Sequence, residues 1–266
     1  MTTRGTAKLL SLTLLAVMGL ALALVGPTPA DAQSAAVGVI GHYRGFSQSI
    51  GNPDVRTAVE LLVDRQDRSD FLGHLTLGPL PFTFAGKIDA LGTLKGRGTG
   101  PAGDVTFTGK FQDLGENAAL VLATYKFTPA TGPVDQGNVD LIRNFNPPPD
   151  SDVPPIGGRW RGTSRSDLGQ GSSTLELLIA QDGTGFGGQE VVDAGTPQEL
   201  RFDFVGTLDA RGTFVVIGVG AAGRFIVGGG LNPPPNNDAQ ARYLLRFVDG
   251  SLDLGTFQIQ PPPDQD

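Results

Sequence analysis

The chain has 266 residues, among them 39 glycines, 20 prolines and no cysteine, and its formal net charge at pH 7 is −7. No disulfide can form, so stability must come from an ordinary hydrophobic core. The acidic balance leaves no basic stripe, which argues against binding to nucleic acid and to anionic membranes. Many glycines and few aromatic residues favour short strands and tight turns over helices.

The chain begins with a segment organised like a secretory signal peptide. Arg4 and Lys8 make a basic start, Leu9–Val25 is an apolar run, and Ala30–Ala32 has the A-x-A form of a cleavage site. We therefore expect a secreted or periplasmic mature chain with no stable membrane anchor. The alternative is a retained anchor, but the small residues and prolines before the cleavage site favour removal. Without cysteine the mature chain can carry no N-terminal lipid.

The region after this segment consists of one unit used twice. Phe84–Gly109 and Phe204–Gly229 align without a gap. Glycine marks turns and bulges where a Cβ fits poorly, so segments that share glycine positions should share their strand layout. The identical pairs are Phe84/Phe204, Gly86/Gly206, Asp89/Asp209, Gly92/Gly212, Gly98/Gly218, Gly100/Gly220, Gly103/Gly223 and Gly109/Gly229.

The similarity extends over nearly the whole mature chain and predicts two domains of about 110 residues, a typical domain size. We assign residues 1–32 to a signal peptide, 37–146 to a first β-barrel repeat and 147–155 to a proline-rich linker. Residues 156–260 form the second β-barrel repeat, and 261–266 form a tail.

Each copy divides into about eight strand candidates bounded by turn residues. Apolar and polar residues alternate along them, as expected for a sheet with one buried face. In the second copy the expected strands are Arg159–Ser166, Thr174–Gln181, Gly185–Val192, Glu199–Leu208, Thr213–Gly220, Arg224–Leu231, Ala239–Val248 and Leu252–Gln260.

Short connections between these strands predict an antiparallel meander, and closing each meander removes its exposed edges. We therefore predict an all-β protein with two tandem eight-stranded antiparallel up-and-down barrels. Two β-sandwiches are the main alternative. A single sixteen-stranded outer-membrane barrel is disfavoured because the proline-rich linker interrupts the meander and the tail lacks a terminal aromatic residue.

The motifs that could indicate enzymatic chemistry are not accompanied by the structure or the neighbouring residues that such chemistry requires. Gly218–Gly223 has the form G-x-G-x-x-G, but a strand follows it instead of the helix that a dinucleotide site needs. The only histidines, His42 and His74, lie on expected strands, align with Arg159 and Gly188 of the second copy, and have no nucleophile motif nearby. We expect both at the surface or the barrel rim.

A metal site is not expected either. Asp64, Asp67 and Asp70 are spaced three apart, which does not fit a calcium loop and indicates a solvated turn. The sequence thus predicts a protein that is not an enzyme, with no catalytic residue, no cofactor and no metal.

Trp160, the only tryptophan, lies in a G-x-W pattern with Gly158 at the start of the second meander. In this respect the chain resembles the calycin superfamily of lipocalins, fatty-acid-binding proteins and avidins. The resemblance implies an eight-stranded barrel in which the tryptophan packs at one end or lines the cavity, with Tyr43 as its counterpart in the first copy. The further tryptophans of avidins and the lipocalin T-D-Y motif are missing. Alternatively, Trp160 is an ordinary core residue.

Two functions remain in view. The first is an exported binding module that holds a small apolar ligand near Trp160 or Tyr43, since eight-stranded barrels can just enclose one. The second is a structural or protein-interaction protein whose barrels are filled by their own side chains. The interior volume discriminates between them, because a binding module needs a cavity.

The two copies are not expected to be equivalent. Thr93–Gly100 contains two charges and should be wet, whereas Thr213–Gly220 is nearly all apolar and must be covered on both faces. This predicts an apolar patch on the outside of the second barrel that contacts either the first barrel or another molecule. We expect either Val216 or Ile226 to lie on that outer face.

Export can be tested by the mass of the mature protein. Intact-mass spectrometry of protein recovered from its own host should show a chain that begins at Gln33. A mature chain that still begins at Met1 would contradict the signal-peptide assignment.

Overall fold

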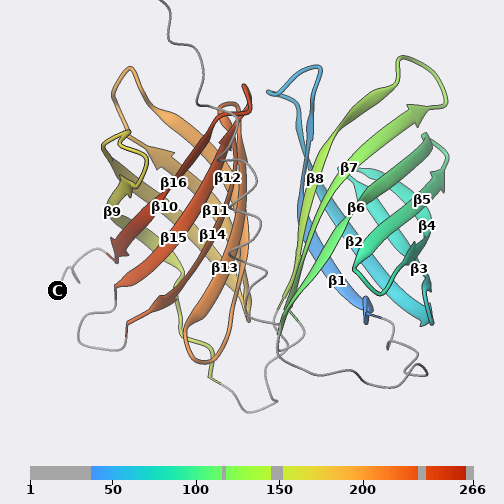
Figure 1. Cartoon of the computed structure of the whole chain (residues 1–266), viewed down its shortest axis with the longest axis horizontal. Coiled ribbons are helices and arrows are strands. Elements are labelled where there is room, and N and C mark those ends of the chain that lie inside the picture. The colour runs from blue at the N-terminus through green and yellow to red at the C-terminus, as the bar shows by residue number, and fades with distance from the viewer. Residues whose placement is uncertain (1–36, 116–117, 145–151, 233–237, 262–266) are drawn as a thin grey trace, which may run out of the picture. The chain divides into compact units, whose positions relative to one another are not determined.

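The computed structural model describes residues 37–115, 118–144, 152–232 and 238–261. These residues form two closed antiparallel barrels of eight strands each, which confirms the predicted fold class (Figure 1). The described part contains no helix long and apolar enough to span a membrane. The assigned signal peptide and most of the linker and tail lie outside the described residues.

Both barrels are simple meanders in which the first strand also pairs with the last. The strands of the first barrel are β1 (Gly41–Ser49), β2 (Arg56–Asp67), β3 (Asp70–Leu77), β4 (Leu80–Ile88), β5 (Thr93–Gly100), β6 (Gly103–Gly115), β7 (Ala118–Pro129) and β8 (Asp135–Arg143). Those of the second are β9 (Gly158–Ser166), β10 (Ser172–Asp182), β11 (Gly185–Val192), β12 (Leu200–Leu208), β13 (Thr213–Gly220), β14 (Gly223–Leu231), β15 (Ala239–Phe247) and β16 (Leu252–Gln260).

The shared aspartate and one shared glycine build the same turn in each barrel. Asp89 Oδ1 accepts hydrogen bonds from the backbone N–H groups of Leu91 (2.9 Å) and Thr93 (2.7 Å). Asp209 does the same two and four residues further along its own turn, at 2.9 and 2.7 Å. Gly92 and Gly212 follow with φ of +74° and +84°, a conformation that favours glycine.

A glutamine at the end of the second strand fixes the entry to each barrel. In the first barrel Gln66 Oε1 accepts from the Val39 N–H at 2.8 Å, while its Nε2 donates to the Val37 carbonyl at 2.8 Å. In the second, Gln181 Oε1 accepts from the Ile156 N–H at 2.7 Å, and its Nε2 donates to the Pro154 carbonyl at 3.0 Å. The segment before the first strand thereby packs an apolar side chain into each core.

The G-x-G-x-x-G segment is a strand, a tight turn and a strand, as predicted. Gly218 and Gly220 lie on β13, Gly223 begins β14, and Gly220 pairs with Gly223 across the turn. The histidines lie on the outer surface near carboxylates: His42 Nε2 is 3.9 Å from Glu60 Oε2, and His74 Nε2 is 3.6 Å from Asp64 Oδ2. The expected counterpart of His74 was wrong by one residue. Gln189 occupies that place, because it pairs with Leu178 as His74 pairs with Leu62.

Part of the outer face of the second barrel, around Ile217 on β13, is covered by the first barrel. Ile217 packs in one cluster with Leu120 and Ile142 of the first barrel, and Ile226 is partly buried against it. Val216 points the other way, into the second barrel. In contrast, Lys95 and Arg97 of the corresponding strand β5 are exposed. The predicted difference between the copies is therefore present.

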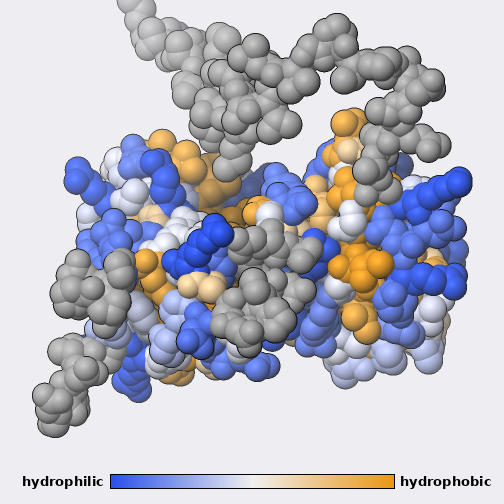
Figure 2. Space-filling view, turned by 90° about the horizontal axis from the view of Figure 1, so that it is seen from below, coloured by the Kyte–Doolittle hydropathy of each residue, from blue (hydrophilic) through white to orange (hydrophobic). Residues whose placement is uncertain are grey.

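Polar contacts flank this apolar cluster. Arg224 of β14 forms an ion pair with Asp140 of β8, with Nη1 and Oδ1 3.0 Å apart, and burial raises the pKa of Asp140 against the opposing effect of Arg224. The Gln48 side-chain amide donates to the Gly220 carbonyl at 2.8 Å. Other large hydrophobic side chains stay exposed, and Figure 2 shows hydrophobic residues beside hydrophilic ones on one face. Single exposed apolar residues of this kind are normal on a protein surface and indicate no site by themselves.

Replacing Ile217 tests the contact between the barrels. Ile217→Lys should lower the free energy of unfolding by on the order of 3 kcal/mol, because it places an unpaired charge where the isoleucine is 1 % exposed. Thermal melting and small-angle scattering measure the loss of stability and of packing. Leu178→Lys is the control, since Leu178 is 56 % exposed on β10. Equal melting of the two variants would contradict this role of Ile217.

Candidate binding cavity

The interior of the first barrel is filled by its own side chains. Phenylalanine rings meet across it, with centroid distances of 5.9 Å for Phe71–Phe84 and 5.5 Å for Phe84–Phe107. Leu75 is fully buried at 0 % exposure. These inward side chains belong to one continuous cluster, as expected for a barrel with this number of strands.

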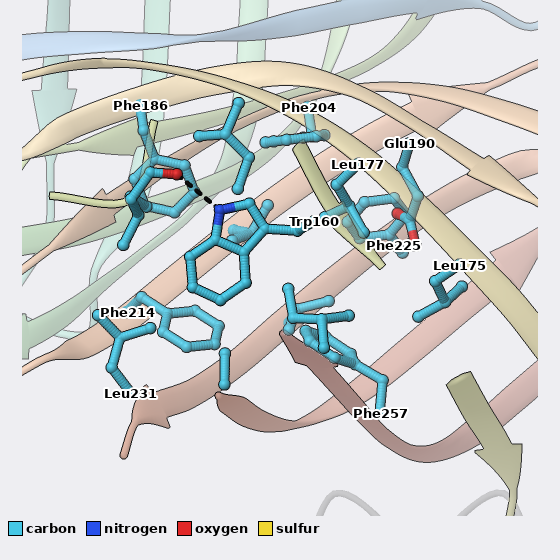
Figure 3. Close-up of a pocket in the computed structure, with 16 residues that line it drawn as sticks. Trp160, Leu175, Leu177, Phe186, Glu190, Phe204, Phe214, Phe225, Leu231 and Phe257 are labelled. Carbon is cyan, nitrogen blue, oxygen red and sulfur yellow. Dashed lines mark hydrogen bonds between the residues drawn. The ribbon is translucent and has the colours of Figure 1, made fainter. Parts of the chain in front are cut away.

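The second barrel encloses an inner chamber of about 40 Å³. Its wall is apolar except for one carboxyl group, that of Glu190 (Figure 3). The lining residues are Ile156, Trp160, Leu175, Leu177, Ile179, Phe186, Glu190, Phe204, Phe214, Val216, Phe225, Val227, Leu231, Ala239, Phe257 and Ile259.

A larger outer chamber of about 220 Å³ adjoins the inner one. The two chambers share five lining residues, which are Leu175, Glu190, Phe225, Val227 and Phe257. The outer chamber also reaches Gln170 in the β9–β10 loop and Gln198 in the β11–β12 loop. Its rim is polar while its floor is apolar, so an apolar body can enter with a polar group held towards the rim.

Trp160 lines the inner chamber, as the resemblance to calycins implied for this residue. It is 6 % exposed, and its indole N–H donates to the Ile156 carbonyl at 2.8 Å (Figure 3). This bond ties the first strand to the segment that enters the barrel. The contact of Trp160 with a ligand remains a prediction.

Tyr43 is the structural counterpart of Trp160, but it lines none of the described chambers. Its hydroxyl donates to the Val39 carbonyl at 2.7 Å, four residues back, as Trp160 does. The guanidinium of Arg143 lies 5.6 Å from the ring centroid and donates to the hydroxyl at 3.3 Å. Burial raises the pKa of Tyr43 to about 12. Tyr43 and Trp160 lie in different barrels and are not brought together in one site.

Glu190 is the residue that the sequence reasoning missed. It lies on β11, paired with Leu177 and Phe202, in the place that Leu75 occupies between Leu61 and Phe82 of the first barrel. It is half-buried, and among the described residues no hydrogen bond or ion pair involves it. Burial raises the pKa of Glu190 to about 7. Its inward position was readable from the alternation with Phe186 and Gly188 along the strand.

Three polar side chains at the rim form a network that the first barrel repeats. Asp253 accepts from Ser166 at 2.5 Å and from the Tyr243 hydroxyl at 2.7 Å. In the first barrel Asp135 accepts from Ser49 and Tyr125 in the same way. Burial and the neighbouring Asp253 raise the pKa of Tyr243, which keeps the phenol a neutral donor. The filled barrel has the same three residues, so we assign this network a structural role: it connects the last two strands of each barrel to the first strand.

The cavity is acidic. Lysine, arginine and histidine are absent from the residues that line the two chambers, whereas Glu190, Asp193 and Asp253 are present. Asp193 accepts from the Thr174 N–H at 2.8 Å, and this bond lowers the pKa of Asp193. Glu190 is therefore the one acid of the three that has no partner within the described chain.

The raised pKa of Glu190 predicts a pH-dependent stability. Between about pH 4.3, the usual value for glutamate, and pH 7 the folded chain keeps a proton that the unfolded chain has lost, so stability should fall as the pH rises through this window. Glu190→Gln removes the effect and should be about 1–2 kcal/mol more stable than wild type at pH 8, allowing for partial exposure.

Urea denaturation at pH 5 and pH 8 measures this difference. Glu176→Gln, on the outer face of β10 where Glu176 lies 3.4 Å from Arg161, is the control and should leave the pH dependence unchanged. A pH dependence that is the same in wild type and Glu190→Gln would contradict the assignment.

Comparisons with known proteins leave the family open. No family model matches the chain, and no curated protein matches it. A solved structure of a protein of unknown function from the DUF3598 family of Nostoc punctiforme PCC 73102 is similar at 13 % identity, covering 83 % of this chain and 94 % of that one, with a TM-score of 0.25. The eight-stranded antiparallel barrels themselves are compatible with a calycin-like fold.

Proposed function

We propose that the chain is an exported, non-enzymatic binding protein that holds a small apolar ligand in its second barrel. The observation that carries the proposal is the difference between two barrels built on one strand plan. The side chains of the first barrel fill its interior in one continuous cluster, whereas the second barrel contains two adjoining chambers. The apolar wall supplies the driving force for an apolar ligand.

The volume of the chambers sets the size of the ligand. A cavity of about 150 Å³ lined by Leu, Ile and Phe holds one benzene ring. The outer chamber of about 220 Å³ therefore admits a ligand somewhat larger than benzene, with the inner chamber of about 40 Å³ available to its tip. Larger lipids do not fit, because drug-sized sites start at about 300 Å³.

Two further parts of the proposal rest on the sequence. The N-terminal segment, which is organised like a signal peptide, supports export to the periplasm or beyond the cell. The calycin-like G-x-W at Gly158 and Trp160 supports a binding role for the tryptophan, which lines the inner chamber. We propose no nucleic-acid partner, since the formal net charge of −7 disfavours contact with a polyanion.

A structural or interaction protein without ligand is the second candidate. The filled first barrel favours it, as does the small volume of the inner chamber. In this case the second barrel would serve as a partner for the first, through the cluster around Ile217. The two candidates differ in one measurable respect, which is whether the second barrel takes up an apolar molecule.

Binding can be read from the single tryptophan, because Trp160 lines the inner chamber. Titration with propylbenzene should change the fluorescence of Trp160 and raise the melting temperature with increasing probe concentration. Val227→Phe should reduce the affinity at least tenfold, because Val227 borders both chambers and its counterpart in the filled barrel is Phe107.

Leu178→Phe is the matched control, since it adds the same ring to the outside of the same barrel. Each variant should keep the β-type circular dichroism of wild type. Absence of saturable propylbenzene binding to wild type would reject the binding proposal in favour of the second candidate.

A further inference from the structure

We propose that the ligand of the second barrel carries a protonated amine, and that Glu190 binds this ammonium group. The inference rests on the proposed binding function and adds the chemical class of the ligand.

Glu190 lies where the two chambers meet. Its strand neighbours are Leu177 on β10 and Phe202 on β12. The same wall contains Phe225 and Leu175 (Figure 3). None of these side chains can donate a hydrogen bond to a carboxylate. A ligand that fills the outer chamber therefore brings its own donor to Glu190 or leaves the carboxyl unpaired.

The fold does not need a carboxyl at this place. The first barrel has Leu75 at the same position, between equivalent strands, and buries it completely. An unpaired acid in an apolar wall lowers stability, whereas leucine there would raise it. Since the first barrel forms with leucine at this position, the architecture does not require the glutamate. We therefore attribute it to contact with a ligand in the cavity.

The surrounding charges select a cation. Asp193 and Asp253 line the outer chamber with Glu190, and no basic residue lines either chamber. A carboxylate or phosphate on the ligand would be repelled by these acids, while an ammonium is attracted to all three. Of the three acids, Glu190 is the one with no hydrogen bond or ion pair within the described chain, whereas Asp253 accepts from Ser166 and Tyr243 and Asp193 accepts from Thr174.

Aromatic rings complete a site for an alkyl ammonium with an apolar body. Phe202 and Phe225 face each other edge to face with ring centroids 5.3 Å apart, next to the position of Glu190. Ring faces attract cations, and the attraction is strongest where water is excluded. The same rings accommodate the hydrocarbon part of the ligand, so a small arylalkylamine satisfies both requirements.

The test compares two probes that share one shape. 2-Phenylethylamine is protonated at pH 7.5, and propylbenzene is its neutral counterpart. Wild type should bind the amine at least tenfold more tightly than propylbenzene, as measured by calorimetry and Trp160 fluorescence. In Glu190→Gln and in Glu190→Leu, the residue of the first barrel, the ratio of amine affinity to propylbenzene affinity should fall to about one or below.

The pH provides a second readout. From pH 5.5 to pH 8 the amine affinity of wild type should rise as Glu190 ionises, while that of Glu190→Gln should change little. The other titratable groups that line the chambers are Asp193, Asp253 and Tyr243, and both proteins retain them.

The outcomes separate the two proposals. If propylbenzene binds but the amine has no advantage, or keeps it in both Glu190 variants, amine recognition is wrong and the binding cavity stands. If neither probe binds to wild type, the binding function fails and the inference fails with it.

Discussion

Barrel closure is the constraint on which the rest of this structure depends. Once the first and last strands pair, every side chain of a strand points either into the barrel or out of it, and the number of strands sets the diameter of the interior. Eight strands leave a space that side chains can just fill. Whether such a barrel is solid or hollow is therefore decided by a few inward positions, and the two barrels of this chain differ at those positions.

The internal repeat separates what the fold needs from what it does not. The glutamine at the barrel entry, the turn aspartate and the Ser–Asp–Tyr network occur in both copies, so they serve the architecture. Leu75 and Glu190 differ at one place, and Phe107 and Val227 at another. The filled first barrel thus serves as a reference for the second, because it shows which residues fill the interior at equivalent positions.

Much of the fold could be predicted from the sequence. Strand bounds in the second copy are correct to within two residues, because alternation and glycine positions are local signals. The apolar outer face of β13 was predicted as well. The sequence could not decide whether the first barrel or another molecule covers it, since this depends on how Ile217 meets Leu120 and Ile142.

The candidate site was only half predictable. The resemblance based on the G-x-W pattern left Trp160 at one end of the barrel, in the wall of its cavity or in an ordinary core, and in the structure it lines the inner chamber. Glu190 was overlooked although its inward position is visible in the strand pattern. Its role depends on how much of the barrel interior is left empty. That volume is set jointly by the inward side chains of eight strands, so no local sequence pattern predicts it.

The ends of the two barrels have a consequence for the order in which the chain folds. Joining β1 to β8 requires residues as far apart as Tyr43 and Arg143 to meet, and pairings over such separations are slow. Arg143 holds this junction in the first barrel by donating to the carbonyls of Gly38 at 3.2 Å and Ile40 at 2.9 Å. The second barrel closes at Gln260 with proline as the next residue, so the part of the chain that the structure describes has no such clasp there. A chain that emerges N-terminus first can thus complete and lock the solid barrel early, and it then offers a finished surface against which the hollow one assembles.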